Sequence, residues 1–184
     1  MNARNIHERF RSGQYTQSDL QSVIDALASG DNDFLDQTVF QYIKRVEIID
    51  EESLIRYLKT AQTGQAAYAV SEIIAGLSNR GTTRQDFVEE VSRFASGVAW
   101  DNQEIARLSA VFALPRVTKC SVRVKSILRA AHQAGNSVVR NAALTSAQLY
   151  FGIPEKDVLR GKDEHDITDK MPKGLLEWLA AETQ

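Results

Sequence analysis

The chain has 184 residues, of which 43% are hydrophobic and 25% are charged, and its formal net charge at pH 7 is −2. These proportions are typical of a globular protein with a core of its own, and they exclude a disordered chain or a general polycation. The single cysteine, Cys120, excludes an internal disulfide framework. The N-terminal residues lack the apolar core of a secretory signal, and no run reaches the roughly 20 apolar residues that span a bilayer. We therefore expect a cytoplasmic protein without a membrane segment.

Apolar residues recur at the spacing of an α-helix, and the alternating pattern of strands is missing from the sequence. We therefore expect an all-α fold with eight helices in four consecutive pairs. The expected ranges are 17–28 and 33–46, 51–61 and 65–78, 84–95 and 102–114, and 121–133 and 137–150. The apolar positions that keep register across the first helices of the pairs are Leu20, Ile24, Leu27, Leu54, Leu58, Ala61, Phe87, Val91, Phe94, Val124, Leu128 and Ala131.

Residues that favour helix ends support these ranges. Side chains that can cap a helix N-terminus precede four of the helices, and they are Thr16, Asp50, Thr83 and Asn136. Asp86 follows Thr83 by three residues, which favours a carboxylate variant of the capping box at that helix. Because proline cannot continue a helix, we expect Pro115, Pro154 and Pro172 where helices end or begin.

The helix pairs recur every 32–37 residues, a period typical of α-solenoids. Arg107 and Arg140 occupy equivalent positions of successive second helices and are followed by small residues. This pattern resembles the second helix of HEAT-like, armadillo-type repeats over residues 65–151, and residues 17–64 resemble such repeats by spacing alone. The resemblance implies a short right-handed α-solenoid of about four antiparallel helix pairs with terminal capping helices. The alternative is an irregular helical bundle.

The spacing predicts one helical-repeat domain over residues 1–184. Repeat-like pairs occupy 14–152 and a C-terminal capping segment occupies 153–184. Residues 2–12 favour a short helix that covers the first pair. An amphipathic helix after Pro172 is expected to cover the last pair, and its alternative role is to dock onto a partner.

Charge is unevenly distributed along the chain. Residues 1–92 carry nine basic and fourteen acidic side chains, whereas residues 105–154 carry seven basic side chains and no Asp or Glu. The candidate basic surface for phosphate or an acidic partner consists of Arg107, Arg123, Lys125, Arg129 and Arg140. For Arg107 and Arg140 we favour a structural role, in which each bonds a neighbouring helix end. For Lys125 and Arg129, partner binding and plain solvation stay open.

The leading functional hypothesis is a non-catalytic protein-binding module. In size and charge the chain resembles bacterial immunity or antitoxin proteins that block a toxin domain, and a basic partner would meet the acidic N-terminal half. The candidate acidic residues are Asp31, Asp33, Asp36, Asp50, Glu51 and Glu52. The alternative is nucleic-acid binding through residues 105–154, by analogy with DNA glycosylases of HEAT-like fold.

No catalytic set or cofactor site emerges from the sequence. His7, His132 and His165 are far apart, and with one cysteine they do not have the spacing of a zinc site. Trp100 and Asp101 are the only neighbouring aromatic and acidic pair near the basic helix, too little for a base pocket. We therefore expect no metal and no cofactor and favour a protein without enzymatic activity. An enzyme of the HEAT-like class stays open as a third hypothesis, as does the oligomeric state.

Overall fold

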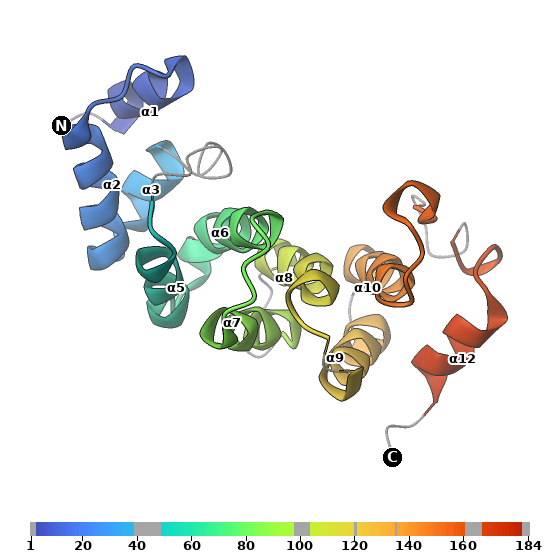
Figure 1. Ribbon diagram of the computed structural model, residues 1–184. Helices are drawn as coiled ribbons and strands as arrows, with labels where there is room; N and C mark the ends of the chain where they lie inside the picture. The colour runs from blue at the N-terminus through green and yellow to red at the C-terminus, as the bar shows by residue number, and fades with distance from the viewer. Residues whose placement is uncertain are drawn as a thin grey trace. The chain divides into compact units, whose positions relative to one another are not determined.

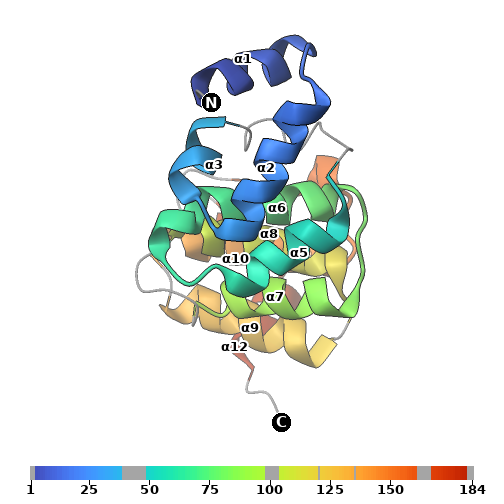
Figure 2. The same ribbon diagram turned by 90° about the vertical axis from the view of Figure 1, so that its left-hand side faces the viewer.

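A computed structural model describes residues 3–38, 49–97, 104–119, 121–134, 136–160 and 167–181. Within these ranges the regular structure is helical, with ten α-helices, two short 3-10 turns and no strand (Figures 1 and 2). The all-α prediction is therefore confirmed. The chain divides into two compact units, Met1–Thr82 and Thr83–Gln184.

The first unit is built from five α-helices and one 3-10 turn. They are α1 (Ala3–Ser12), α2 (Gln17–Ser29), α3 (Asn32–Thr38), α5 (Glu51–Thr60), the turn η1 (Gly64–Ala66) and α6 (Ala67–Asn79). Helix α2 packs against α3 and α5, while α3 also contacts α1 and α6. The short N-terminal helix expected from the sequence is α1. Residues 39–46 of the expected 33–46 helix lie outside the described residues.

A network around Asp19 holds α1 to the start of α2. The side chain of Asp19 is 2% exposed and forms a bidentate ion pair with the guanidinium group of Arg9. Asp19 also accepts the amide of Thr16, whose hydroxyl in turn accepts the amide of Asp19, which completes a capping box. Because Asp19 belongs to this capping box and also pairs with Arg9 of α1, it joins the N-terminus of α2 to α1. His7 links α1 to a second helix, because its Nδ1 lies 2.5 Å from the carbonyl oxygen of Thr38, the last residue of α3.

The second unit also contains five α-helices. They are α7 (Gln85–Ala95), α8 (Glu104–Val117), α9 (Ser121–Ala134), α10 (Ser137–Tyr150) and α12 (Lys173–Ala180), with the 3-10 turn η2 (Glu155–Asp157) after α10. Helix α8 packs against both α7 and α10, and α9 packs against α10. Of the twelve apolar positions predicted to keep register in the two units, all are buried except Ile24, which is partly exposed.

Two predictions about helix ends are wrong. Pro115 lies inside α8, which continues to Val117. Proline removes the amide that would bond the carbonyl of Val111 four residues earlier, and the buried hydroxyl of Ser146 on α10 donates to that carbonyl instead, at 2.9 Å. The tertiary hydrogen bond replaces the missing helical one, so the helix need not end.

The start of α7 also differs from the prediction. Arg84 is the residue at the N-cap position, and it makes no capping bond through its side chain. In place of the expected box with Thr83, Asp86 forms an ion pair with Arg84 at 2.9 Å and accepts the amide of Phe87 at 3.0 Å. The caps predicted at Thr16, Asp50 and Asn136 are confirmed, since each side chain accepts an amide of its helix.

Candidate partner-binding surfaces

Three of the six candidate acidic residues, Asp31, Asp50 and Glu51, form hydrogen bonds that support the fold of the first unit. Asp31 accepts the amide of Phe34 at 3.0 Å at the start of α3. Asp50 accepts the amide and the hydroxyl of Ser53, and these bonds hold the pKa of the Asp50 carboxyl below its usual range. These carboxylates cap helices, so they are poor candidates for partner contacts.

Glu51 joins α5 to the end of α6. Its Oε1 accepts the hydroxyl of Thr82 at 2.7 Å, and the guanidinium group of Arg80 donates to the carbonyl oxygen of Ile49 at 3.4 Å. Glu52 is exposed and also takes part in a contact within the chain. Glu51 is therefore a structural residue in the same way as the two capping aspartates.

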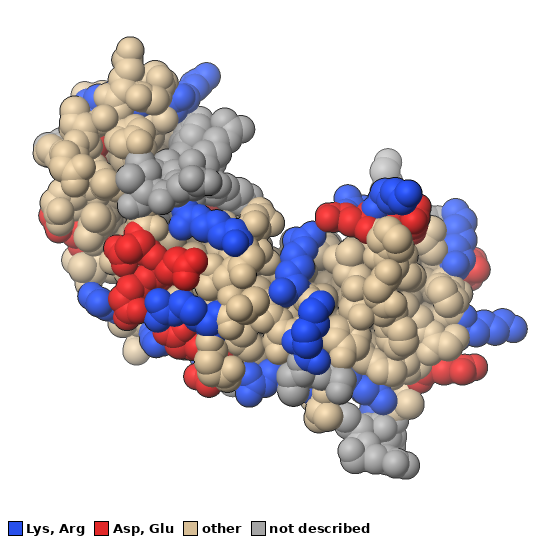
Figure 3. Space-filling model, in the orientation of Figure 1, with Lys and Arg blue, Asp and Glu red and all other residues tan. Residues whose placement is uncertain are grey.

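Asp33 and Asp36 differ from the other four. Both are exposed on α3, and within the described ranges neither forms a hydrogen bond or an ion pair. They are three residues apart, so they project from nearby positions of the same helix. In the view of Figure 3, acidic side chains gather over α5 with basic ones beside them, which makes the charge of this unit mixed rather than uniform.

The two halves of the predicted acidic surface lie toward opposite ends of α5. The hydroxyl of Tyr57 donates to Oδ1 of Asn32, at 2.5 Å, and this bond places the start of α3 beside the C-terminal half of α5. Asp50 caps the other end of the same helix. Six residues separate Tyr57 from Glu51, which is about 9 Å along a helix axis. The structure therefore brings the candidates into two groups.

Arg107 has the structural role that the sequence favoured. Its Nε donates to the carbonyl oxygen of Ala95, the last residue of α7, at 3.2 Å. Partial burial lowers the pKa of this guanidinium group. A cation at the C-terminal end of a helix is stabilised by the unpaired carbonyls there. Arg140 is the fourth residue of α10, as Arg107 is of α8, and it is half-buried with a contact inside the chain.

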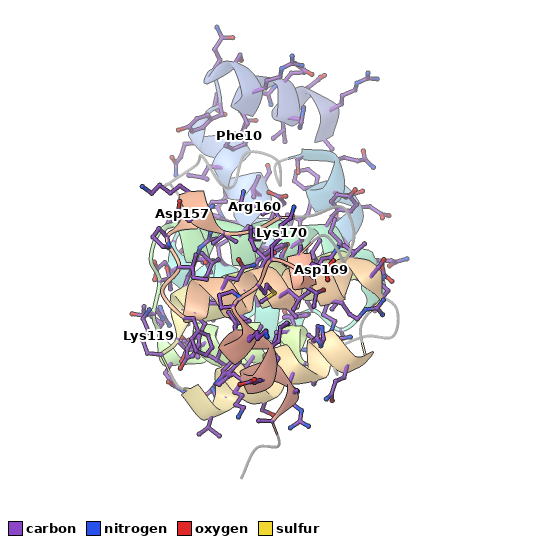
Figure 4. All side chains as sticks on the ribbon, turned by 90° about the vertical axis from the view of Figure 1, so that its right-hand side faces the viewer. Phe10, Lys119, Asp157, Arg160, Asp169 and Lys170 are labelled. Carbon is purple, nitrogen blue, oxygen red and sulfur yellow. The ribbon has the colours of Figure 1, made fainter. Side chains whose placement is uncertain are left out.

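Lys125 and Arg129 are partly exposed and both contact the C-terminal segment that contains α12. The ammonium group of Lys125 lies 5.8 Å from the ring centroid of Trp178, and Nη1 of Arg129 donates to the carbonyl oxygen of Ala181 at 2.7 Å. Figure 4 views this side and shows the C-terminal segment lying across α9 and α10. Arg123, on the same helix, remains exposed. Of the basic candidates, four of five are engaged within the chain.

An aromatic cluster at the end of α10 was not found from the sequence. Trp178 stacks on Tyr150 with ring centroids 5.7 Å apart and meets Phe151 edge to face at 5.0 Å. Phe151 is 49% exposed, so the cluster lies at the surface. The apolar spacing of the last helix is visible in the sequence, but the helices against which it packs are not.

Other charged groups of the second unit pair at the surface. Arg116 and Arg160 both contact Oε1 of Glu155, at 3.0 and 3.3 Å. Asp157, Asp169 and Lys119, labelled in Figure 4, are exposed. These contacts are typical of a solvated protein surface.

The structure shows no candidate metal centre among the residues it describes, because no three His, Cys, Asp or Glu side chains gather there. Trp100 and Asp101, considered above for a base pocket, and His165, considered for a metal site, lie outside the described residues, as does Cys120. No helix in the described ranges has the length and apolar character needed to cross a membrane. Comparisons with protein-family models, curated proteins and solved structures gave no match.

Proposed function

We propose that the protein is a non-catalytic protein-binding module of the cytoplasm that uses Asp33 and Asp36, on α3 of its first unit, to bind a basic partner. The observation that supports this proposal is the contrast between the two charged surfaces. Asp33 and Asp36 keep exposed carboxylates without a partner in the described part of the chain. In contrast, Lys125 lies over the ring of Trp178 on α12 and Arg129 donates to the carbonyl oxygen of Ala181, just after α12. Opposite charges on a partner would be recognised mainly by Asp33 and Asp36.

The finer form of the proposal is an inhibitor of the immunity or antitoxin type. Such a protein needs a surface that a basic toxin domain can meet, and no chemistry of its own. The proposal includes a HEAT-like repeat for the pairs α7–α8 and α9–α10. The contact between the two second helices, α8 and α10, supports it, since second helices of neighbouring repeats stack in a solenoid. Nucleic-acid binding through residues 105–154 is the alternative outcome of the test below.

The test is capture of binding proteins from nuclease-treated native lysate on immobilised full-length chain, with elution by increasing salt. The double variant Asp33→Lys/Asp36→Lys reverses charge at two exposed carboxylates that form no hydrogen bond or ion pair within the described ranges. We expect it to lose a basic protein that the wild-type chain retains, because like charges would then face each other. Charge reversal at Asp50 is avoided, since that residue caps α5.

The matched control is Asp157→Lys/Asp169→Lys, which changes the net charge by the same amount on exposed residues of the second unit. Retention of the partner by this control and its loss from the first variant would support binding through Asp33 and Asp36. Equal retention by both variants would contradict that assignment. Nucleic acid as the only bound species in lysate without nuclease would favour the alternative.

A further inference from the structure

The contacts that hold α12 recognise two features of a helix. The first is an aromatic side chain: Lys125 lies over the ring of Trp178, and Tyr150 and Phe151 flank it. A cation over an indole face and an offset or edge-on aromatic neighbour are both favourable arrangements. Together, α9 and α10 form a site for one large aromatic side chain.

The second feature is the helix C-terminus. Ala181 follows the last residue of α12, its amide bonds the carbonyl oxygen of Glu177, and its own carbonyl accepts Nη1 of Arg129. The last carbonyls of any helix lack helical donors, so a guanidinium group placed there recognises the backbone whatever the sequence. Arg129 therefore contacts the C-terminal end of the helix in this site.

Helix α12 depends on this surface for its order. It contains eight residues, and isolated helices shorter than about 12–15 residues are marginal in water. Leu175 and Leu179 are each 3% exposed, so one side of the helix is buried although Phe151 beside it is largely open. The contacts with α9 and α10 thus supply the free energy that folds the segment.

We propose that the surface of α9 and α10 beneath α12 is a helix-binding site, and that α12 is its occupant within the chain. The partner that fits it is an amphipathic helix whose last turns carry two aliphatic residues and one large aromatic residue, spaced as Leu175, Leu179 and Trp178. The site lies in the second unit and uses no acidic residue of the first. This proposal and the function proposed above can therefore be tested separately.

Competition decides when a partner binds. A tethered segment has an effective concentration in the millimolar range, so α12 occupies the site in the absence of a partner. A longer helix with the same pattern loses less conformational entropy on binding than an eight-residue one, and so binds more tightly per contact. When a partner helix replaces α12, the C-terminal segment is released and exposed. Because the two helices compete, the fraction of sites that hold the partner depends on the concentration of the partner.

The experiment is a fluorescence-anisotropy titration of full-length chain into a fluorescein-labelled peptide spanning residues 170–184. Glu177→Pro breaks α12 at an exposed position, because proline inside a helix costs about 3 kcal/mol. It changes no residue of α9 or α10. We expect this variant to bind the peptide at least about tenfold more tightly than the wild-type chain or Glu177→Ala, since its site is vacated.

Arg129→Ala, added to Glu177→Pro, is expected to weaken peptide binding about fivefold or more, because the charged hydrogen bond to the helix end is lost. Arg123→Ala in the same background is the matched control, since Arg123 is exposed on α9, and should leave the affinity unchanged. If circular dichroism shows that Glu177→Pro loses helix beyond α12, Trp178→Ala takes its place.

The proposal is overturned if the vacated chain binds the peptide no better than the wild-type chain. It is also overturned if Arg123→Ala and Arg129→Ala weaken binding equally, because general charge attraction would then explain it. Binding of a fluorescent single-stranded oligonucleotide in place of the peptide would assign the surface to nucleic acid instead. A wild-type dimer that exchanges α12 between copies would make a second copy, and not a partner protein, the occupant.

Discussion

The hydroxyl of Ser146 on α10 donates a hydrogen bond of 2.9 Å to the carbonyl oxygen of Val111 on α8, the acceptor that Pro115 leaves without its helical amide. Ser146 is fully buried, so this bond is not shared with bulk solvent. A serine on one helix therefore compensates a proline in another, and the packing of α8 on α10 is tied to the continuity of α8.

Removing the hydroxyl of Ser146 should lower the stability of the fold only in a chain that keeps Pro115. We expect Ser146→Ala to lower the free energy of unfolding by about 1–3 kcal/mol, because a buried carbonyl loses its donor. In a Pro115→Ala background, residue 115 regains an amide that can bond Val111, and the same substitution should cost distinctly less. Urea unfolding of the two single variants and the double variant measures this coupling. Equal costs in both backgrounds would show that the hydroxyl does not replace the amide.

Gly97 meets two requirements at the end of α7. Its φ is +79°, which disfavours residues with a Cβ, and a Cβ at this position would lie 2.9 Å from Cζ of Arg107. Gly152 has nearly the same φ, +81°, with nothing within 4 Å of such a Cβ. Gly152→Ala therefore measures backbone strain alone, about 1–2 kcal/mol. Gly97→Ala should lower the free energy of unfolding by more than Gly152→Ala does, because Arg107 must also give up its hydrogen bond with Ala95.

Thermal unfolding followed by circular dichroism compares the two alanine variants directly. In an Arg107→Ala background the obstacle is gone, and Gly97→Ala should then destabilise about as much as Gly152→Ala does in the wild-type chain. A larger effect at Gly152 than at Gly97 would contradict the steric role given to the guanidinium group.

Local chemistry accounts for what the sequence could predict. Helix α10 was predicted with its observed bounds, 137–150, and the capped helices α2 and α5 begin where Thr16 and Asp50 place them. Caps and apolar periodicity act within a few residues, so one sequence suffices to read them. The length of α8 could not be read in this way, because the donor that permits Pro115 is on another helix.

The candidate sites show the same limit. For Lys125 and Arg129 the sequence left partner binding and plain solvation open. Neither alternative includes the observed hydrogen bond of Arg129 to Ala181, which lies 52 residues away in the chain.

Likewise, the sequence identified Asp50 as a helix cap but left Glu51 and Asp36 as equal candidates for partner binding. Only the hydrogen bond of Glu51 with Thr82 separates a structural carboxylate from one without a partner in the described ranges. Tertiary partners therefore decide which charges are available for function.

Asp19 should make the first unit sensitive to acid. Hydrogen bonds from Arg9, and then from Thr16, outweigh burial and hold the pKa of the Asp19 carboxyl well below its usual range in the folded chain. Since the unfolded chain takes up the proton first, this stabilisation is complete above the ordinary carboxyl pKa of about 3.9 and is lost as the pH falls below it. Acid should therefore weaken the attachment of α1.

The check is urea unfolding of the wild-type chain and Asp19→Asn at several values of pH. We expect the variant to be less stable at pH 7, and the difference to narrow between pH 5 and pH 3. Asp36→Asn, at an exposed carboxylate without a partner in the described ranges, is the control and should change stability little at either pH. A gap between Asp19→Asn and the wild-type chain that widens in acid would contradict the assigned sign.

Gln148 attaches the C-terminal segment to α10 independently of α12. Its amide is 1% exposed, accepts the backbone amide of Leu159 at 2.9 Å and donates to the carbonyl of Leu159 at 3.1 Å. Gln148→Met keeps the length of the side chain but leaves both backbone groups without their partner, and should destabilise the second unit by about 2–3 kcal/mol. Gln133→Met, at an exposed position of α9, is the matched control.

Hydrogen exchange followed by mass spectrometry distinguishes local from general destabilisation in this variant. Amides around Leu159 should lose protection in Gln148→Met, because their hydrogen bonds end at the missing amide, whereas α2 and α5 in the first unit should keep theirs. Glu177→Pro should do the reverse within the C-terminal segment, exposing α12 while the amide of Leu159 stays protected by Gln148. If either variant released both parts together, the segment would be attached as one cooperative element, and α12 could not leave its site alone.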